Sequence, residues 1–131
     1  MATYVLVHGG WDGGWAWRGI ARRLQAAGHE VFTPTLTGSG ERAHLASPDV
    51  DLSTQIMDVV NVLRYEKLEE VILVANSYGG MVITGVAEKL PSRIKQMIYL
   101  DAFVPVDGES LADLAGPDVM GYMEQAAAAF G

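Results

Sequence analysis

Two spacings of apolar residues alternate along the chain. Short continuous apolar runs, typical of buried strands, occur at residues 3–8, 30–34, 70–75 and 94–100. Between these runs, apolar residues recur at helical spacing, which predicts helices over residues 15–27, 52–65 and 78–90. This strand–helix order predicts an α/β fold, with a parallel sheet that carries helices on both faces.

The ends of the predicted elements fit this pattern. Gly28 follows the first helix and Pro91 ends the third, as expected for residues that stop helices. Residues 35–51 are rich in Gly, Ser, Thr and Asp, which predicts a loop. The third helix is apolar on most of its faces, so we expect other elements to enclose it. The fourth strand is expected to form an uncovered edge of the sheet.

The character of the chain changes after Pro105. We assign residues 1–105 to the N-terminal part of the α/β core and residues 106–131 to a separate segment. That segment is helix-prone over residues 110–114 and 120–130. The sequence stops within a helical pattern that lacks a cap, so we do not expect Gly131 to be the natural end of a domain.

Composition and charge narrow the class of protein. Half of the 131 residues are hydrophobic and 19% are charged, which is typical of a globular domain. The net charge of −7 disfavours nucleic acids and anionic membranes as partners. No apolar run is long enough to span a membrane, and no export signal follows Met1. Because cysteine is also absent, we expect a cytoplasmic protein.

The strongest candidate for chemistry lies between the most apolar strand and the most apolar helix. Ser77 sits at this junction, where a sharp turn would strain the backbone and expose the hydroxyl. The small residues Ala75 and Gly79 flank it at the two positions where the backbones crowd; only Ala75 departs from the pattern G-x-S-x-G. We predict that Ser77 is a nucleophile; the alternative is a serine that merely caps the helix.

A second glycine-rich turn follows the first strand. Both turns lie at the carboxyl ends of strands, where α/β sheets bind ligands. We predict that the N–H groups of Gly10 and Tyr78 form an oxyanion hole, because hydrolases of this type take one donor from each turn. Gly9 and Trp11 are predicted to contact the substrate. The alternative is that the glycines only make the turn flexible.

Three motifs resemble a known family. Residues 8–17, HGGWDGGWAW, are similar to the H-G-x-x-x-G-x-W-x-W opening of the small α/β-hydrolases, which include methylesterases, salicylate-ester esterases and hydroxynitrile lyases. Residues 38–45, GSGERAHL, are similar to the G-x-G-x-R loop of that family. Residues 99–105, YLDAFVP, are similar to its segment after the strand that follows the nucleophile. The resemblance covers nearly the whole chain.

The resemblance implies a serine hydrolase that cleaves a small-molecule carboxylic ester through an acyl-enzyme and needs no cofactor. It implies that residues 106–131 begin a helical cap, and that the triad acid and histidine follow Gly131. This piece alone would then be inactive, and a C-terminal half or a homodimer partner would complete it.

Some positions depart from the family. Asn76 stands where the family has His or Glu, whereas its lyases carry Glu there and Thr in place of Gly9. These departures favour ester hydrolysis over the alternative of a hydroxynitrile lyase. A relative that binds a ligand without catalysis is a further alternative.

Other residues rank below these candidates. His8 is expected to brace the glycine turn and His29 to lie at the surface. His44 is expected to lie in a loop, with a position facing the pocket as an alternative. Asp101 ends the last predicted strand and suits either a triad acid or a structural turn. Residues 38–43 match a loose dinucleotide pattern but do not open a helix after the first strand. The scattered histidines give no metal site.

Overall fold

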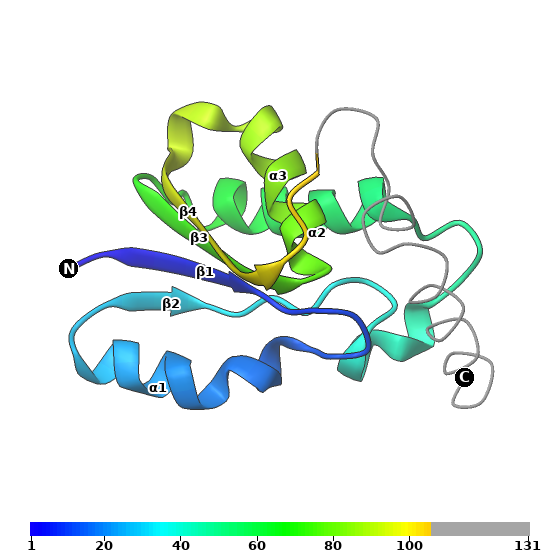
Figure 1. Ribbon diagram of the computed structural model, residues 1–131, viewed down its shortest axis with the longest axis horizontal. Coiled ribbons are helices and arrows are strands. Elements are labelled where there is room, and N and C mark those ends of the chain that lie inside the picture. The colour runs from blue at the N-terminus through cyan, green and yellow to red at the C-terminus, as the bar shows by residue number, and fades with distance from the viewer. Residues whose placement is uncertain (106–131) are drawn as a thin grey trace.

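The computed structural model describes residues 1–105, which form a parallel sheet with helices on both faces (Figure 1). The strands are β1 (Thr3–Val7), β2 (Glu30–Phe32), β3 (Val71–Ser77) and β4 (Ile94–Ala102). Their order in the sheet is β2-β1-β3-β4, and every neighbouring pair is parallel. The predicted α/β class is therefore confirmed, and among residues 1–105 the fourth strand lies at an edge of the sheet, as predicted. The predicted cap, residues 106–131, lies outside the described residues.

The helices form a layer on each side of the sheet. α1 (Arg18–Ala26) lies on one face, and α2 (Leu52–Tyr65) and α3 (Gly79–Lys89) lie on the other (Figure 1). The side chain of Asp51 accepts a hydrogen bond from the Thr54 N–H at 3.1 Å and so begins α2 with a capping box.

Two segments differ from the sequence prediction. Residues 15–17 belong to the 3₁₀ turn η1 (Gly14–Trp17), which precedes α1. The Ala16 N–H donates to the Gly13 carbonyl at 3.0 Å, a bond between residues three apart that gives the tighter turn. The predicted loop over residues 35–51 contains a second 3₁₀ segment, η2 (Gly40–Leu45). A third, η3 (Pro91–Arg93), leads into β4.

The core lies on both faces of the two central strands. Its larger part, between the sheet and α2 and α3, contains Val5, Val7, Val59, Val60, Leu63, Leu73, Ala75, Val82 and Ile83. Its smaller part, on the α1 side, contains Leu6, Trp17, Ala21, Ile72 and Val74. Residues 71–75 of β3 are all buried, which explains why this strand reads as one continuous apolar run.

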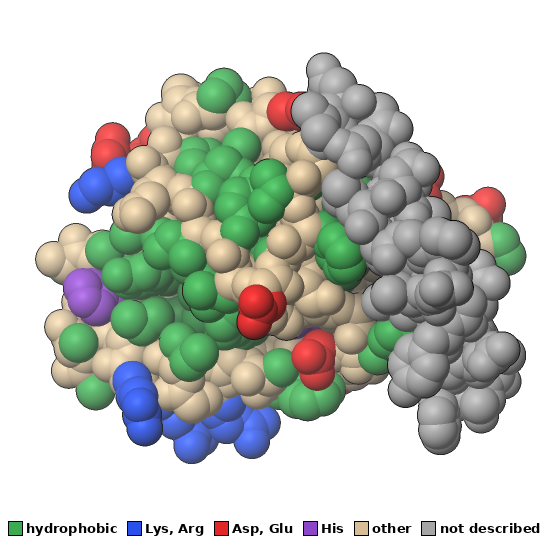
Figure 2. All heavy atoms as spheres, viewed as in Figure 1, with side chains coloured by type: hydrophobic (Ala, Val, Ile, Leu, Met, Phe, Trp, Pro, Cys, Tyr) green, Lys and Arg blue, Asp and Glu red, His purple; other side chains and the backbone are tan. Residues whose placement is uncertain are grey.

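The α1 side of β4 is less well covered by the described residues. Hydrophobic side chains gather on the surface of this part of the molecule in Figure 2. Ile20 of α1 is 48% exposed and Leu100 of β4 is 45% exposed. In the described part of the chain, no helix combines the length and the apolar character needed to cross a membrane.

Candidate active site

Ser77 lies where β3 turns into α3. Its φ angle is +51°, in the left-handed region that costs a residue with a side chain about 1–3 kcal/mol. Tyr78 then adopts a helical conformation and is the N-cap residue of α3. Ser77 is partly buried, and its hydroxyl makes no hydrogen bond to another residue within 1–105. The turn therefore presents a hydroxyl that no other residue of 1–105 engages, at the carboxyl end of the central strand.

Two glycines bring α3 close to the strand ends. A Cβ atom on Gly79 would lie 2.7 Å from the Val7 carbonyl oxygen, at the end of β1. A Cβ atom on Gly80 would lie only 2.0 Å from the Phe103 carbonyl oxygen, just after β4. These approaches fix the N-terminus of α3 beside Ser77, where its positive dipole end favours negative charge.

The first glycine-rich turn meets the Ser77 turn. A Cβ atom on Gly9 would lie 3.1 Å from the Ser77 Cβ atom and 3.3 Å from Asn76 Oδ1. Gly9 is buried and Gly10 is exposed. Neither the Gly10 N–H nor the Tyr78 N–H donates a hydrogen bond to another residue in the described part of the chain. The two predicted oxyanion donors therefore belong to adjoining turns, and neither is engaged by another residue among 1–105.

His8 braces the glycine turn, as the sequence predicts. It is 1% exposed, and its Nε2 atom accepts a hydrogen bond from the Leu36 N–H at 3.0 Å. The proton must then lie on Nδ1, which donates to the Gly9 carbonyl oxygen at 2.7 Å. Because both ring nitrogens are engaged, His8 is not placed to accept a proton from Ser77.

The other two histidines are no better placed. His29 precedes β2, at the opposite end of the sheet, and its Nδ1 atom accepts the Ala2 N–H at 3.0 Å. It is partly buried, against the edge of the Tyr4 ring, rather than fully at the surface as we expected. His44 is exposed on η2.

Asp101 occupies an irregular position at the end of β4. The pairing register shifts here, with Asn76 opposite Leu100 but Ser77 opposite Ala102. Asp101 is thus the extra residue of a bulge, and its φ angle is +45°. Its side chain is exposed and makes no hydrogen bond to another residue among those described. These features fit the structural-turn alternative for Asp101.

Behind the predicted oxyanion hole lies a chain of polar contacts that the sequence did not predict. The Tyr78 hydroxyl donates to Gln55 Oε1 of α2 at 2.5 Å, and Gln55 Nε2 donates to the Thr37 carbonyl oxygen at 3.1 Å. Both carboxylate oxygens of Asp58 accept from Thr37, one from its N–H at 2.6 Å and one from its hydroxyl at 2.7 Å. Arg42 forms an ion pair with Asp58 at 3.7 Å. Burial, and secondarily the charge of Asp51, raise the pKa of Tyr78 to about 12.

The loop after β2 is held to the first glycine turn as well. The Thr35 hydroxyl accepts the Gly14 N–H at 2.9 Å and donates to Glu41 Oε2 at 2.7 Å. This hydrogen bond from Thr35 is the main reason why the pKa of Glu41 lies below its ordinary value. The Arg42 guanidinium donates to the Thr35 carbonyl oxygen at 2.8 Å. The charged residues of the G-x-G-x-R motif therefore brace the loop from within.

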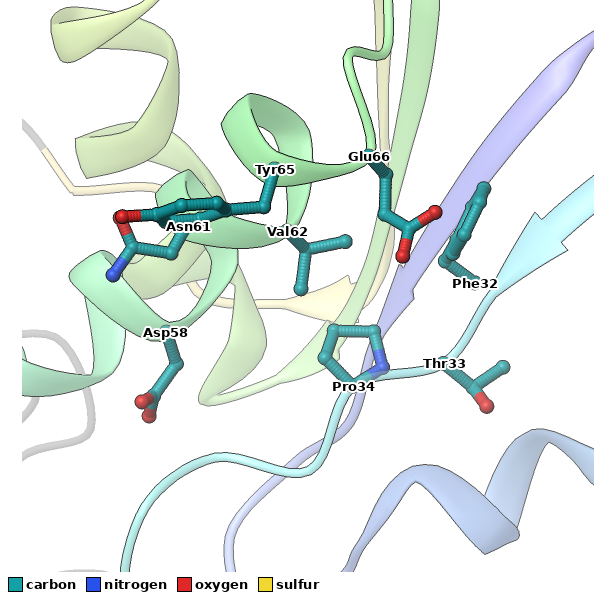
Figure 3. A pocket seen from close by; sticks show the side chains of 8 residues that line it. All are labelled: Phe32, Thr33, Pro34, Asp58, Asn61, Val62, Tyr65 and Glu66. Carbon is teal, nitrogen blue, oxygen red and sulfur yellow. The ribbon is translucent and has the colours of Figure 1, made fainter.

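Two hollows in the described part bear on the location of the site. One, of about 290 Å³, adjoins the glycine turn and is lined by His8, Gly9, Asp12, Ala16, Trp17, Ile20, Asn76 and Leu100. Trp11 is 58% exposed and does not line it. The other, of about 460 Å³, lies between α2 and the segment after β2, with Asp58 and Glu66 on either side of Val62 (Figure 3). None of the predicted site residues lines this second hollow.

No metal centre is visible in the described residues. Within residues 1–105, no three side chains of His, Cys, Asp or Glu gather in a way that could hold an ion. The segment that matches the loose dinucleotide pattern ends in η2, a 3₁₀ turn after the second strand. A dinucleotide would need a helix that opens directly after the first strand.

Comparisons with known proteins show which family and which relatives the chain resembles. A family model described as "Alpha/beta hydrolase family" matches residues 4–131. A carbendazim hydrolyzing esterase from Nocardioides is 55% identical over 87% of this chain and 47% of that protein. An alpha-hydroxynitrile lyase from Arabidopsis thaliana is 37% identical over 78% of this chain and 40% of that protein.

A solved structure extends the comparison to the fold. An extracellular alpha/beta-hydrolase from a Paenibacillus species matches with a TM-score of 0.86 and 34% identity, over 95% of this chain and 50% of that one. The chain therefore spans about half the length of the proteins that it matches.

Proposed function

The chain belongs to the alpha/beta hydrolase family, and on that premise we propose that it carries the nucleophile and oxyanion hole of a serine hydrolase that cleaves carboxylic esters. One observation carries the proposal: the strained Ser77 turn adjoins the Gly9–Gly10 turn, and each offers a free N–H group. A serine hydroxyl and two amide donors in adjoining turns are the parts that acyl transfer requires.

In the proposed reaction, the Ser77 hydroxyl oxygen attacks the ester carbonyl carbon. The carbonyl oxygen becomes an oxyanion and accepts hydrogen bonds from the N–H groups of Gly10 and Tyr78. Each such donor stabilises the transition state by about 3 kcal/mol in enzymes of this kind. The proposed triad histidine accepts the proton of the Ser77 hydroxyl and passes it to the departing oxygen, so that the alcohol leaves. The same histidine then takes a proton from water, which hydrolyses the acyl-Ser77 ester and regenerates the hydroxyl.

The base and the acid of the triad are proposed to come from outside residues 1–105. The chain holds three histidines, and residues 106–131 contain none. Of the three, His8 has both ring nitrogens engaged, His29 lies at the far end of the sheet, and His44 is exposed on η2. The matched relatives are about twice as long, which supports a C-terminal segment, rather than a second copy, as the source.

Ester hydrolysis is favoured over the lyase alternative by two observations. The relative named an esterase is 55% identical, whereas the relative named a hydroxynitrile lyase is 37% identical. At position 9, any side chain would start 3.1 Å from the Ser77 Cβ atom, and glycine leaves no hydroxyl there. Position 9 therefore supplies no second hydroxyl beside the nucleophile.

The test is hydrolysis of a p-nitrophenyl ester by the full-length protein and its variants. Ser77→Ala is expected to abolish hydrolysis, while Ser53→Ala, on the exposed side of α2, keeps the wild-type rate. Ester binding should survive in Ser77→Ala, because the oxyanion donors are main-chain groups. Wild-type protein that binds the ester but does not hydrolyse it would instead favour the non-catalytic ligand-binding alternative.

A further inference from the structure

We propose that His8, Gln55 and the Tyr78 hydroxyl are positioning residues, coupled through Leu36 and Thr37, that hold the two oxyanion N–H groups in a fixed relation. The inference rests on the proposed function for what those N–H groups bind. It goes beyond that function because it assigns the network behind the hole a role in the chemical step.

The orientation of the first donor, the Gly10 N–H, is set by a hydrogen bond to the carbonyl of the same peptide group. The Gly9 carbonyl and the Gly10 N–H belong to one planar trans peptide, so they point in opposite directions. The His8 Nδ1–H holds that carbonyl at 2.7 Å, and thereby turns the Gly10 N–H away from the protein interior. His8 is itself held by the Leu36 N–H, at 3.0 Å from its Nε2 atom.

The orientation of the second donor, the Tyr78 N–H, is set in the same way. The Ser77 carbonyl and the Tyr78 N–H share a peptide group, and the Phe103 N–H binds that carbonyl at 3.1 Å. In addition, the Tyr78 side chain is tied to α2 by its hydrogen bond to Gln55, at 2.5 Å. The orientation of Tyr78 is therefore fixed at its backbone and at the end of its side chain.

The hydrogen bonds that hold His8 and Gln55 end on two adjacent residues, Leu36 and Thr37. Leu36 holds His8, and the Thr37 carbonyl accepts the hydrogen bond from Gln55 at 3.1 Å. Asp58 accepts hydrogen bonds from both the N–H and the hydroxyl of Thr37, so Thr37 is tied to α2, the helix that also carries Gln55. Leu36 is 1% exposed, so its side chain is fixed in the core beside this network. A shift of the Gln55–Tyr78 pair is thus transmitted to the Gly9–Gly10 peptide.

The consequence for catalysis is specific. A misaligned oxyanion donor weakens binding of the transition state but not of the ground state, so kcat falls while KM is unchanged. Complete loss of one donor lowers kcat by about 100-fold to 1,000-fold. Loss of its alignment alone is expected to lower kcat by about 10-fold, since the N–H group remains.

The test compares Tyr78→Phe, Gln55→Leu and the double variant in the full-length protein. Each is expected to lower kcat for a p-nitrophenyl ester by about 10-fold with KM unchanged, and the double variant to be no worse than either. Tyr99→Phe is the matched control, because it removes another part-buried phenol hydrogen bond, 2.7 Å from Thr84 Oγ1 on α3. Equal kcat values in Tyr78→Phe, Gln55→Leu and Tyr99→Phe would overturn the inference.

A second measurement does not depend on turnover. In ¹H–¹⁵N spectra of the full-length protein, Gln55→Leu is expected to move the Gly10 amide resonance, whereas Tyr99→Phe leaves it in place. An unmoved Gly10 resonance in Gln55→Leu would contradict the coupling. If the wild-type protein hydrolyses no ester, the proposed function fails, and the spectra still decide whether the two turns are coupled.

Discussion

Gly80→Ala tests the close approach between the start of α3 and the segment after β4, which positions the Ser77 turn. Glycine in a helix costs up to about 1 kcal/mol relative to alanine, so this change in the first turn of α3 would stabilise the helix if no other atom stood in the way. A Cβ atom at this position lies 2.0 Å from the Phe103 carbonyl oxygen, about 1 Å inside any distance that real Cβ atoms show. That oxygen belongs to the backbone and cannot rotate aside, so we place the overpacking cost near 3 kcal/mol, at the upper end of the usual range.

The net expectation for Gly80→Ala is a loss of about 2 kcal/mol in the free energy of unfolding, measured in urea. The melting temperature should fall by roughly 5–10 °C. Gly19→Ala in α1 is the control, because its added Cβ has no atom of the described residues within 4 Å beyond its chain neighbours and its own helix backbone. It should stabilise the protein by up to about 1 kcal/mol. Equal gains in both variants would refute the close packing of α3 on the end of β4.

Three further predictions concern the polar network. Asp58→Asn replaces one of the two carboxylate oxygens that accept hydrogen bonds from Thr37 with an NH₂ group, which cannot accept. Urea unfolding should therefore show that the free energy of unfolding falls by about 2 kcal/mol. The pKa of Glu41 is lowered below 4.5 in the folded protein, so its contribution to stability is present above pH 4.5 and is lost as the pH falls through the folded pKa; Glu41→Gln should remove this acid-dependent part. The pKa of Tyr78 is raised from 10.0 to about 12, so stability should fall as the pH rises between these values, and this fall should shrink in Tyr78→Phe.

Local patterns predicted most of the fold. The helix predicted over residues 52–65 has these bounds in the structure, because Asp51 caps it and its apolar positions face the sheet. β3 extends two residues beyond the prediction to Ser77, since Phe103 still binds the Ser77 carbonyl after the sequence pattern turns helical. β4 likewise continues to Ala102 through the bulge at Asp101, which no local propensity marks.

The candidate site was predictable where a motif spans a few residues. Ser77 and the glycine turn stand out in the sequence because their chemistry depends on backbone geometry that small residues permit. The Gln55–Tyr78 contact joins residues 23 apart, and the His8–Leu36 contact joins residues 28 apart. Thr37 and Asp58 look like ordinary loop and helix residues in the sequence, so their part in the network emerges only from the fold.

Peptide mapping of the full-length protein after treatment with a fluorophosphonate probe tests the central proposal most directly. We predict one rapid adduct, on the peptide that contains Ser77, which is absent from Ser77→Ala; the 131-residue chain should react slowly, since a serine without a base is a weak nucleophile. An adduct on a different residue, or rapid labelling that persists in Ser77→Ala, would contradict the account.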